Sequence, residues 1–464
     1  MIGKPIRYGL FIILGLIISS SVNATNGYFG HGYGTKNKGL AGGGVALPQD
    51  AMITATNPAG LVFVGERVDL GITFFSPVRN YSATASGNNL PDTTPCSAIP
   101  GSGCPFTIGG NQTAQSIDSD NELFLIPHFA MNWILSPKAS LGVSVYGNGG
   151  MNSDYSGGFA QHDDGSNAPL EGSLITSAGT FGAGTTGVNL EQLFINTTYA
   201  RKMTATSSWG VSLIAAYQRF KAEGLGNFAG FSTNAAALTN NGTDDSFGYG
   251  FKVGVQGEVL TGLTLAASYQ SRIDMDEFDK YSGLFAEKGD FDIPPTWTAG
   301  LALKSTPKSV VTFDVQHIQY SDVAAIANPM NNLINTTTGC SAGVTSRCLG
   351  GAQGAGFGWR DMTIYKIGWQ WASSPSWTWR AGFSHGKQPI PDSEVVFNIL
   401  APAVIEDHLT LGFSYDISKT SELSVQYMHG FKNSVTGANP LNPSQEITIE
   451  MYQNELEASW GWKF

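Results

Sequence analysis

The stretch ELEASWGWKF (455–464) decides the fold. Large apolar side chains such as Leu456 and Phe464 alternate in it with charged or small ones such as Glu455 and Lys463. A period of two indicates a β-strand with one apolar face. If the aromatic face meets lipid, the charged side chains point into the lumen of a closed barrel, and this strand closes the barrel against the first one.

The same alternation continues from residue 66 onward. Six short turns join pairs of alternating segments, at about 136–140, 204–208, 262, 305–309, 373–376 and 418–421. These hairpins supply twelve strands, and a first strand near 66–77 and a last near 449–464 bring the predicted total to 14. Long connections join the hairpins. An even strand number, with short turns at one end and long loops at the other, is typical of bacterial outer-membrane barrels.

Tryptophan distinguishes such a barrel from a soluble β-sandwich, whose strands also alternate. Eight of the ten tryptophans lie beside a short turn or in the last strand: Trp133, Trp209, Trp369, Trp371, Trp377, Trp379, Trp460 and Trp462. Membrane barrels carry aromatic girdles of this kind at the membrane interface. We therefore predict an all-β, 14-stranded antiparallel transmembrane barrel in the outer membrane.

Composition excludes several other classes of protein. Charged residues make up 13% of the 464 residues, compared with about 25% in typical soluble domains. The formal net charge of -11 disfavours a nucleic-acid partner, which would require a basic surface. A mean hydropathy near zero argues against a helical membrane protein. We expect a monomer, and no cofactor or metal.

The first 65 residues divide into two parts. Residues 1–24 resemble a secretory signal peptide, with Lys4 and Arg7 before an apolar run and Ala24 at a small-residue cleavage site. Residues 25–65 are glycine-rich, show no strand alternation and are too few to form their own core. We expect them to form a plug inside the barrel, which then occupies residues 66–464.

Four cysteines form two close pairs, Cys96 with Cys104 and Cys340 with Cys348. Four cysteines allow three pairings. The local pairing is favoured because each pair lies within one loop of an exported protein. A metal site built from all four remains the alternative.

Residues 25–61 resemble the N-terminal hatch of the FadL/TodX family, outer-membrane transporters of long-chain fatty acids and other hydrophobic compounds. The shared pattern is a glycine-rich start, the segment AGGGVA (41–46), an Asp-Ala step at Asp50, and the triplet Asn57-Pro58-Ala59. The resemblance implies a 14-stranded barrel closed by its hatch.

The resemblance also implies a sideways exit. In the family, an inward kink in the third strand opens the barrel wall. The third predicted strand here, 140–150, contains Gly147-Asn148-Gly149-Gly150, and glycine within a strand marks a bulge or bend. The alternative is that the strand simply ends there. By resemblance, Asn57-Pro58-Ala59 would pack against this kink.

Candidate ligand-binding residues follow from strand phase and from the hatch. Lys252, Lys366 and Arg380 oppose the apolar face of their strands, so they are candidates for binding a carboxylate in the lumen. Their alternative role is pairing with Glu455, Glu457 or Glu258 to join hatch and barrel. Tyr28 and Phe29 are candidates for a pocket wall, and their alternative role is packing within the plug.

We therefore expect passive uptake of long-chain fatty acids or similar hydrophobic molecules, and no enzymatic activity. The expected partners are the hydrophobic ligand, outer-membrane lipid and lipopolysaccharide. The alternatives are an aromatic-hydrocarbon channel of the same family, an outer-membrane barrel enzyme that hydrolyses lipids, and an adhesin or structural barrel.

Overall fold

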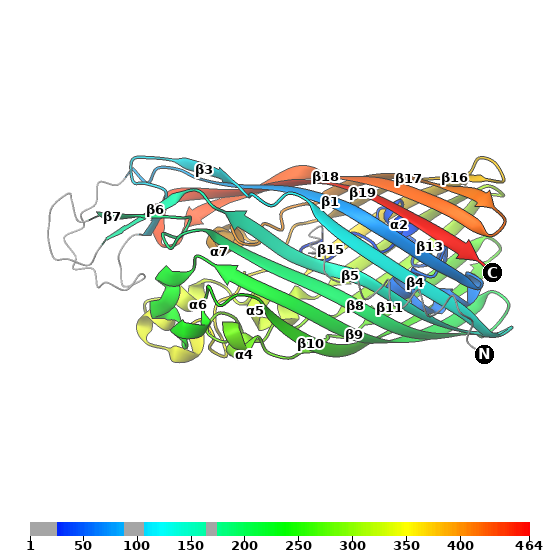
Figure 1. Ribbon diagram of the computed structural model, residues 1–464, viewed down its shortest axis with the longest axis horizontal. Coiled ribbons are helices and arrows are strands. Elements are labelled where there is room, and N and C mark those ends of the chain that lie inside the picture. Colours follow the sequence, from blue (N-terminus) through cyan, green and yellow to red (C-terminus); the bar gives the residue numbers. More distant parts are fainter. Residues whose placement is uncertain (1–25, 88–105, 164–173) are drawn as a thin grey trace.

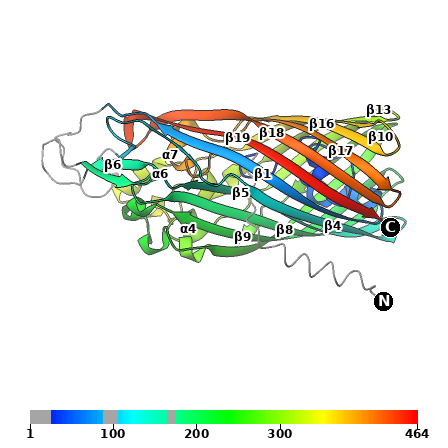
Figure 2. The same cartoon turned by 45° about the horizontal axis from the view of Figure 1, so that its top comes forward.

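The structure, a computed structural model, describes residues 26–87, 106–163 and 174–464. Fourteen antiparallel strands form a closed barrel (Figures 1 and 2). They are β1 (Arg67–Ala83), β4 (Phe124–Ser136), β5 (Ala139–Tyr155), β8 (Thr186–Lys202), β9 (Ser207–Glu223), β10 (Asp244–Leu260), β11 (Leu263–Gln270), β13 (Thr296–Thr306), β14 (Ser309–Ile318), β15 (Met362–Ala372), β16 (Trp377–Gly386), β17 (Asp407–Ser418), β18 (Ser421–Asn439) and β19 (Asn442–Lys463). β1 pairs with β19 and β10 pairs with β11, which closes the ring. The predicted 14-stranded barrel is confirmed.

Side chains alternate between the two faces of the wall as the sequence predicts. On β19, Glu455 and Glu457 are 1% and 0% exposed, whereas Leu456 and Phe464 are 48% and 77% exposed. The outer face is therefore apolar and the inner face polar. All six predicted short turns join hairpins at one end of the barrel, here called the turn end. The opposite end is called the loop end.

The connection expected at 433–448 differs from the prediction. Instead of a long loop, β18 and β19 continue to a tight turn between Asn439 and Asn442. The reason is that Ile447 and Ile449 keep the inward phase of β19 and are buried, and that Val435, which follows a bulge in β18 after Gly430, is buried too. The alternation therefore continues beyond the point where turn residues suggested a loop.

Strand length varies around the barrel. β1, β5, β8, β9 and β10 have 17 residues each and β19 has 22, whereas β11, β14 and β16 have 8 to 10. The long strands rise beyond the short ones at the loop end (Figure 1).

Short helices occur in the segments that connect the strands at the loop end. They are η2 (Gly226–Phe231), η3 (Ala235–Ala237), η4 (Asp279–Tyr281), α4 (Ala286–Gly289), η5 (Tyr320–Asp322), α5 (Ala324–Ala327), α6 (Asn331–Ile334), η6 (Cys340–Ala342), η7 (Thr345–Arg347), η8 (Asp392–Glu394) and α7 (Val395–Asn398). In the described ranges, no helix is long and apolar enough to cross a membrane.

Five short strands complete the loop end. β2 (Phe106–Ile108), β6 (Phe159–Asp163) and β7 (Leu174–Ala178) form a separate sheet. β3 (Gln115–Asp118) pairs with β1, and β12 (Asp274–Met275) pairs with β10. The proposed signal peptide and the Cys96–Cys104 pair lie outside the described residues.

Residues 26–65, here called the hatch, lie inside the barrel (Figure 1). The hatch contains α2 (Thr35–Lys38), α3 (Ile53–Thr56) and η1 (Pro58–Phe63). Lys38 Nζ lies 3.0 Å from Glu455 Oε1 and 2.7 Å from Glu457 Oε2 on β19. Burial alone would lower the pKa of Lys38, but the two carboxylates outweigh it and the pKa is raised. On another part of the wall, Asp314 accepts hydrogen bonds from the backbone N–H groups of Gly44 and Val45 at 2.7 and 2.8 Å.

Candidate functional site

An apolar cavity of about 40 Å³ lies among the segments of the loop end. Chain segments far apart in the sequence build its wall, and none of its described lining residues is charged. Its aromatic lining consists of Phe220, Phe228, Phe285, Phe357 and Phe397. A cavity lined only by apolar groups stays dry and accepts apolar molecules. The cavity is therefore suited to hydrocarbon.

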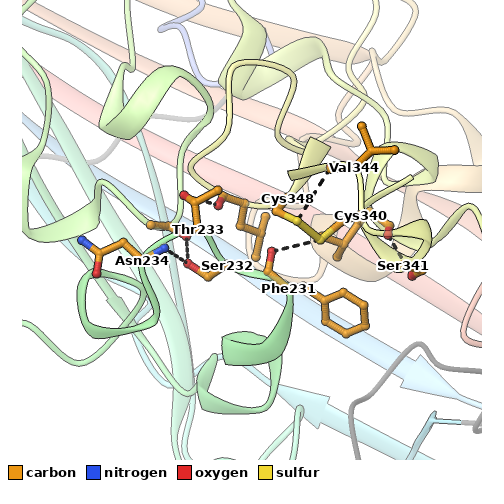
Figure 3. Close-up of a disulfide and its surroundings, with 11 residues drawn as sticks. Phe231, Ser232, Thr233, Asn234, Cys340, Ser341, Val344 and Cys348 are labelled. Atoms are coloured by element: carbon orange, nitrogen blue, oxygen red, sulfur yellow. Dashed lines mark hydrogen bonds between the residues drawn. A yellow bond between two sulfur atoms is a disulfide. The ribbon is translucent and has the colours of Figure 1, made fainter. Parts of the chain in front are cut away.

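A disulfide lies next to one of the residues that line this cavity, and Figure 3 shows the disulfide with its surroundings. Cys340 and Cys348 are joined at 2.01 Å, as the sequence predicts, so this pair does not belong to a metal site. The next residue, Leu349, lines the cavity. Backbone hydrogen bonds from Leu349 N to Phe231 O and from Thr233 N to Leu349 O, both 2.9 Å, join the disulfide loop to the end of η2. The covalent loop thus helps to position the cavity wall.

Aromatic rings lead from the cavity to the beginning of the hatch. The ring of Phe285 lies 4.7 Å from that of Phe291, which lies 6.1 Å from that of Tyr28. Tyr28 in turn contacts Phe29 at 5.1 Å, and Tyr320 contacts both of them. Tyr28 and Phe29 are fully buried. The structure therefore places both predicted residues in an aromatic path, and their contact with a ligand remains a prediction.

This path ends where the barrel wall is interrupted. β4 and β5 are paired only from Ser136 and Ala139 to Phe129 and Val145. Beyond Val145, β5 keeps its pairing with β8 but leaves β4. Residues 146–153 are all buried, whereas alternate residues before them are partly exposed, so the strand turns inward. β5 therefore does not end at its glycines, and its ladder with β8 contains a bulge between Gly147 and Gly149.

The hatch occupies the edge of β5 that β4 leaves free. Gly30 N donates to Asn148 O at 3.0 Å, and Gly150 N donates to Tyr28 O at 2.9 Å. A side chain at Gly149 would place its Cβ 1.9 Å from Tyr28 O. Glycine is required there because two backbones approach too closely for any Cβ.

The triplet Asn57-Pro58-Ala59 lies elsewhere than the resemblance implied. Asn57 and Pro58 pack against Gly210 of β9 and Gly254 of β10, where any side chain would clash with them. Ser208 Oγ donates a hydrogen bond to Ala59 O at 2.6 Å. The backbone of the hatch start, rather than this triplet, contacts the kink. The reason is that the glycines of β9 and β10 leave room for the triplet on the opposite side of β8.

The three inward cations hold the hatch. Lys366 Nζ donates to His31 O at 2.9 Å, Arg380 Nε donates to the Gln49 side chain at 2.7 Å, and Lys252 Nζ donates to Ala55 O. All three partners are oxygen atoms of the hatch. The alternative role predicted from the sequence, pairing with Glu455, Glu457 or Glu258, is therefore not what these hydrogen bonds show. Lys252 and Lys366 also line a polar cavity of about 30 Å³ between hatch and wall. Carboxylate binding by these cations remains a prediction.

Several residues in or beside the path do not follow from the sequence patterns. Phe291, Tyr320 and Trp359, whose ring lies 6.0 Å from that of Tyr28, come from segments without strand alternation. Arg79 extends β1 beyond the predicted strand, although it keeps the inward phase of Arg67 and Phe75. That phase is the signal that could have identified Arg79.

A pair of carboxyl groups lies beside the aromatic path. Asp290 and Asp292 flank Phe291, and the Arg272 guanidinium contacts both of them. Burial, together with the neighbouring Asp292, raises the pKa of Asp290 to about 8. Burial and the neighbouring carboxyl group therefore favour the protonated form of Asp290.

A closed barrel with an N-terminal segment in its lumen and an apolar path to an interrupted wall defines an outer-membrane transport protein. The chain matches the family model for outer membrane protein transport protein (OMPP1/FadL/TodX) over residues 16–459, and it belongs to this family. The protein is therefore located in the bacterial outer membrane, with its turn end in the periplasm and its loop end outside.

Solved structures with a similar fold come from several bacteria. The toluene transporter TodX of Pseudomonas putida gives a TM-score of 0.59 at 15% identity, covering 94% of this chain and 99% of that one. A FadL homologue of Pseudomonas aeruginosa gives 0.62 at 14% identity, covering 96% and 100%. The toluene transporter TbuX of Ralstonia pickettii gives 0.57 at 15% identity, covering 94% and 99%. At these identities the likeness shows the fold alone. No curated protein matches the chain by sequence.

Proposed function

We propose that this protein takes up long-chain fatty acids or similar hydrophobic molecules without an energy source and releases them sideways at the kink of β5. The observation that carries the proposal is the aromatic path that joins the outer cavity to the interrupted β4–β5 ladder. The hatch, held by buried ion pairs, acts as the plug that blocks an aqueous route.

The driving force is the partition of the fatty acid's hydrocarbon tail from water into lipid. Each methylene group that leaves water contributes about 0.8 kcal/mol. A gap in the wall lets the tail enter the membrane while the hatch remains in place. Neither nucleotide hydrolysis nor a cofactor is needed for a downhill transfer of this kind.

Uptake of aromatic hydrocarbons is the second candidate. It is favoured by the outer cavity, which is small and has no charged residue among its described lining residues. TodX and TbuX, with similar folds, are named toluene transporters. A neutral cargo would need no cation along the path.

The test is uptake by cells that lack their own transporter for hydrophobic compounds. Cells that produce this protein should take up a labelled long-chain fatty acid several-fold faster than cells with an empty vector. Faster uptake of toluene alone would favour the second candidate, and no gain for either compound would overturn the proposal.

Lipids that co-purify with the detergent-extracted protein should include fatty acids by mass spectrometry. Ester hydrolysis by the purified protein would indicate an enzyme instead.

A further inference from the structure

The wall has a second discontinuity directly above the first. On β1, pairing with β4 stops at Phe75 and pairing with β3 begins at Asn80. Pro77, which has no N–H group to donate, lies between them. Because β4 also leaves β5 beyond Val145, β1 and β5 are joined here by the segment before β4, in which Ser119 N donates to Arg79 O and Asp120 N donates to Asp154 O.

The side chain of Arg79 crosses this gap. Its Nη1 donates to Asn152 O and, at 3.2 Å, to Asn152 Oδ1 on β5. Its Nη2 donates to Asn121 O in the segment before β4. Arg79 is 2% exposed, and its guanidinium lies 5.8 Å from the ring centre of Phe124. The Arg79 side chain thus adds a link between β1, β5 and the segment before β4 at the point where the regular ladder is interrupted.

The position of Arg79 connects the gap to the aromatic path. Arg79 and Asn152 line a small cavity of about 10 Å³ together with Gly27 and Trp359. The ring of Trp359 lies 6.0 Å from that of Tyr28. A fatty acid that moves from the aromatic path toward the gap therefore passes the guanidinium.

Arg79 has the carboxylates of Glu122 and Asp154 near it, but among the described residues no carboxylate forms an ion pair with its guanidinium. In the described part of the chain its hydrogen bonds all go to uncharged oxygen atoms, and its Nε is buried without a partner. A carboxylate binds a guanidinium through two parallel hydrogen bonds, about twice as strong as bonds to neutral acceptors. An arriving carboxylate is thus a better partner than the two asparagines.

We propose that Arg79 is the latch of the sideways exit, and that a carboxylate on the cargo opens it by taking the guanidinium from Asn121 and Asn152. This inference rests on the proposed sideways release. It makes Arg79 a residue that selects acids over neutral hydrophobic molecules, distinct from Lys252, Lys366 and Arg380, which hold the hatch.

The test compares uptake of a long-chain fatty acid with uptake of its methyl ester. Wild-type protein should take up the acid faster. In Arg79→Met the latch is absent, so ester uptake should rise several-fold and the acid should lose its advantage. Arg201→Met, which removes an exposed arginine from β8, is the matched control and should keep the wild-type ratio. An unchanged ratio in Arg79→Met would overturn the latch.

A second variant tests the latch in the opposite direction. Asn152→Asp gives Arg79 a permanent carboxylate partner, which should slow uptake of both compounds by roughly tenfold, the factor expected for one charge-assisted hydrogen bond. Heat-modifiable migration in gels checks that each variant is folded. If Arg79→Met does not fold, Asn152→Asp alone decides, and wild-type rates in it would overturn the proposal.

Failure of the latch and failure of the exit give different results. Gly149→Val, which obstructs the exit itself, is measured in parallel. If it slows uptake while the Arg79 and Asn152 variants behave like wild type, sideways release stands and the latch is wrong. If none of the variants changes uptake, sideways release is wrong as well.

Discussion

Gly149 is the residue at which sideways release is most directly testable. A valine there would meet the Tyr28 carbonyl at Cβ and extend into the gap, so Gly149→Val should slow fatty-acid uptake several-fold. The displaced backbone should cost about 1–3 kcal/mol of stability, as overpacking does. Gly157→Val, at an exposed position after the end of β5 where a Cβ would meet only Ile117 at ordinary contact distance, is the control. Normal uptake by Gly149→Val would remove the kink from the mechanism.

Asp290 is the residue expected to make the protein sensitive to pH. Its pKa of about 8 lies above that of an unfolded aspartate, so the folded state retains a proton that the unfolded chain has lost. Stability should therefore fall as the pH rises from about 4 to about 8. Asp290→Asn should reduce this decline in the midpoint of thermal unfolding. An identical pH profile in the variant would show that other groups cause it.

At the scale of elements, the loop closed by Cys340 and Cys348 should limit the flexibility of the cavity wall. The disulfide closes a short loop. Removing it should lower the free energy of unfolding by roughly 2–3 kcal/mol, because the unfolded chain regains the entropy that closing the loop removes. In the double variant Cys340→Ser, Cys348→Ser, trypsin should cleave faster after the half-buried Arg347. Cleavage after the exposed Arg360, outside the loop, serves as the internal control. Equal rates at Arg347 in both proteins would contradict a structural role for the disulfide.

The sequence predicts those elements that have one face in contact with lipid. The strands follow from alternation because their outer face is apolar and their inner face is polar, as Leu456 and Glu455 illustrate. The glycines of β5 likewise indicate the bend. The contacts of Phe291, Tyr320 and Trp359 with Tyr28 do not follow, because they join segments without periodicity. The placement of Asn57-Pro58-Ala59 depends on Gly210 and Gly254, which no local pattern connects with the hatch.

At the scale of the whole molecule, the hatch should decide whether the barrel conducts ions. Removing residues 26–60 should turn a sealed barrel into an open pore, measured as single-channel conductance in planar bilayers. The deletion leaves Glu455 and Glu457 without Lys38, so it should be made together with Glu455→Gln and Glu457→Gln. The full-length protein with these two substitutions is the control. Unchanged conductance after deletion would mean that the hatch is not the plug.

Because the strands differ in length, we expect one side of the loop end to be more rigid than the other. The β1–β19 and β5–β8 ladders continue over the full length of their strands to the outer rim, so bending there would break many backbone hydrogen bonds together. Beyond the ends of β11, β14 and β16, the loop end is built from helical turns outside the barrel ladder. If the molecule admits a bulky hydrophobic ligand, we therefore expect the helical turns of the lower side to move more than the strands of the taller side.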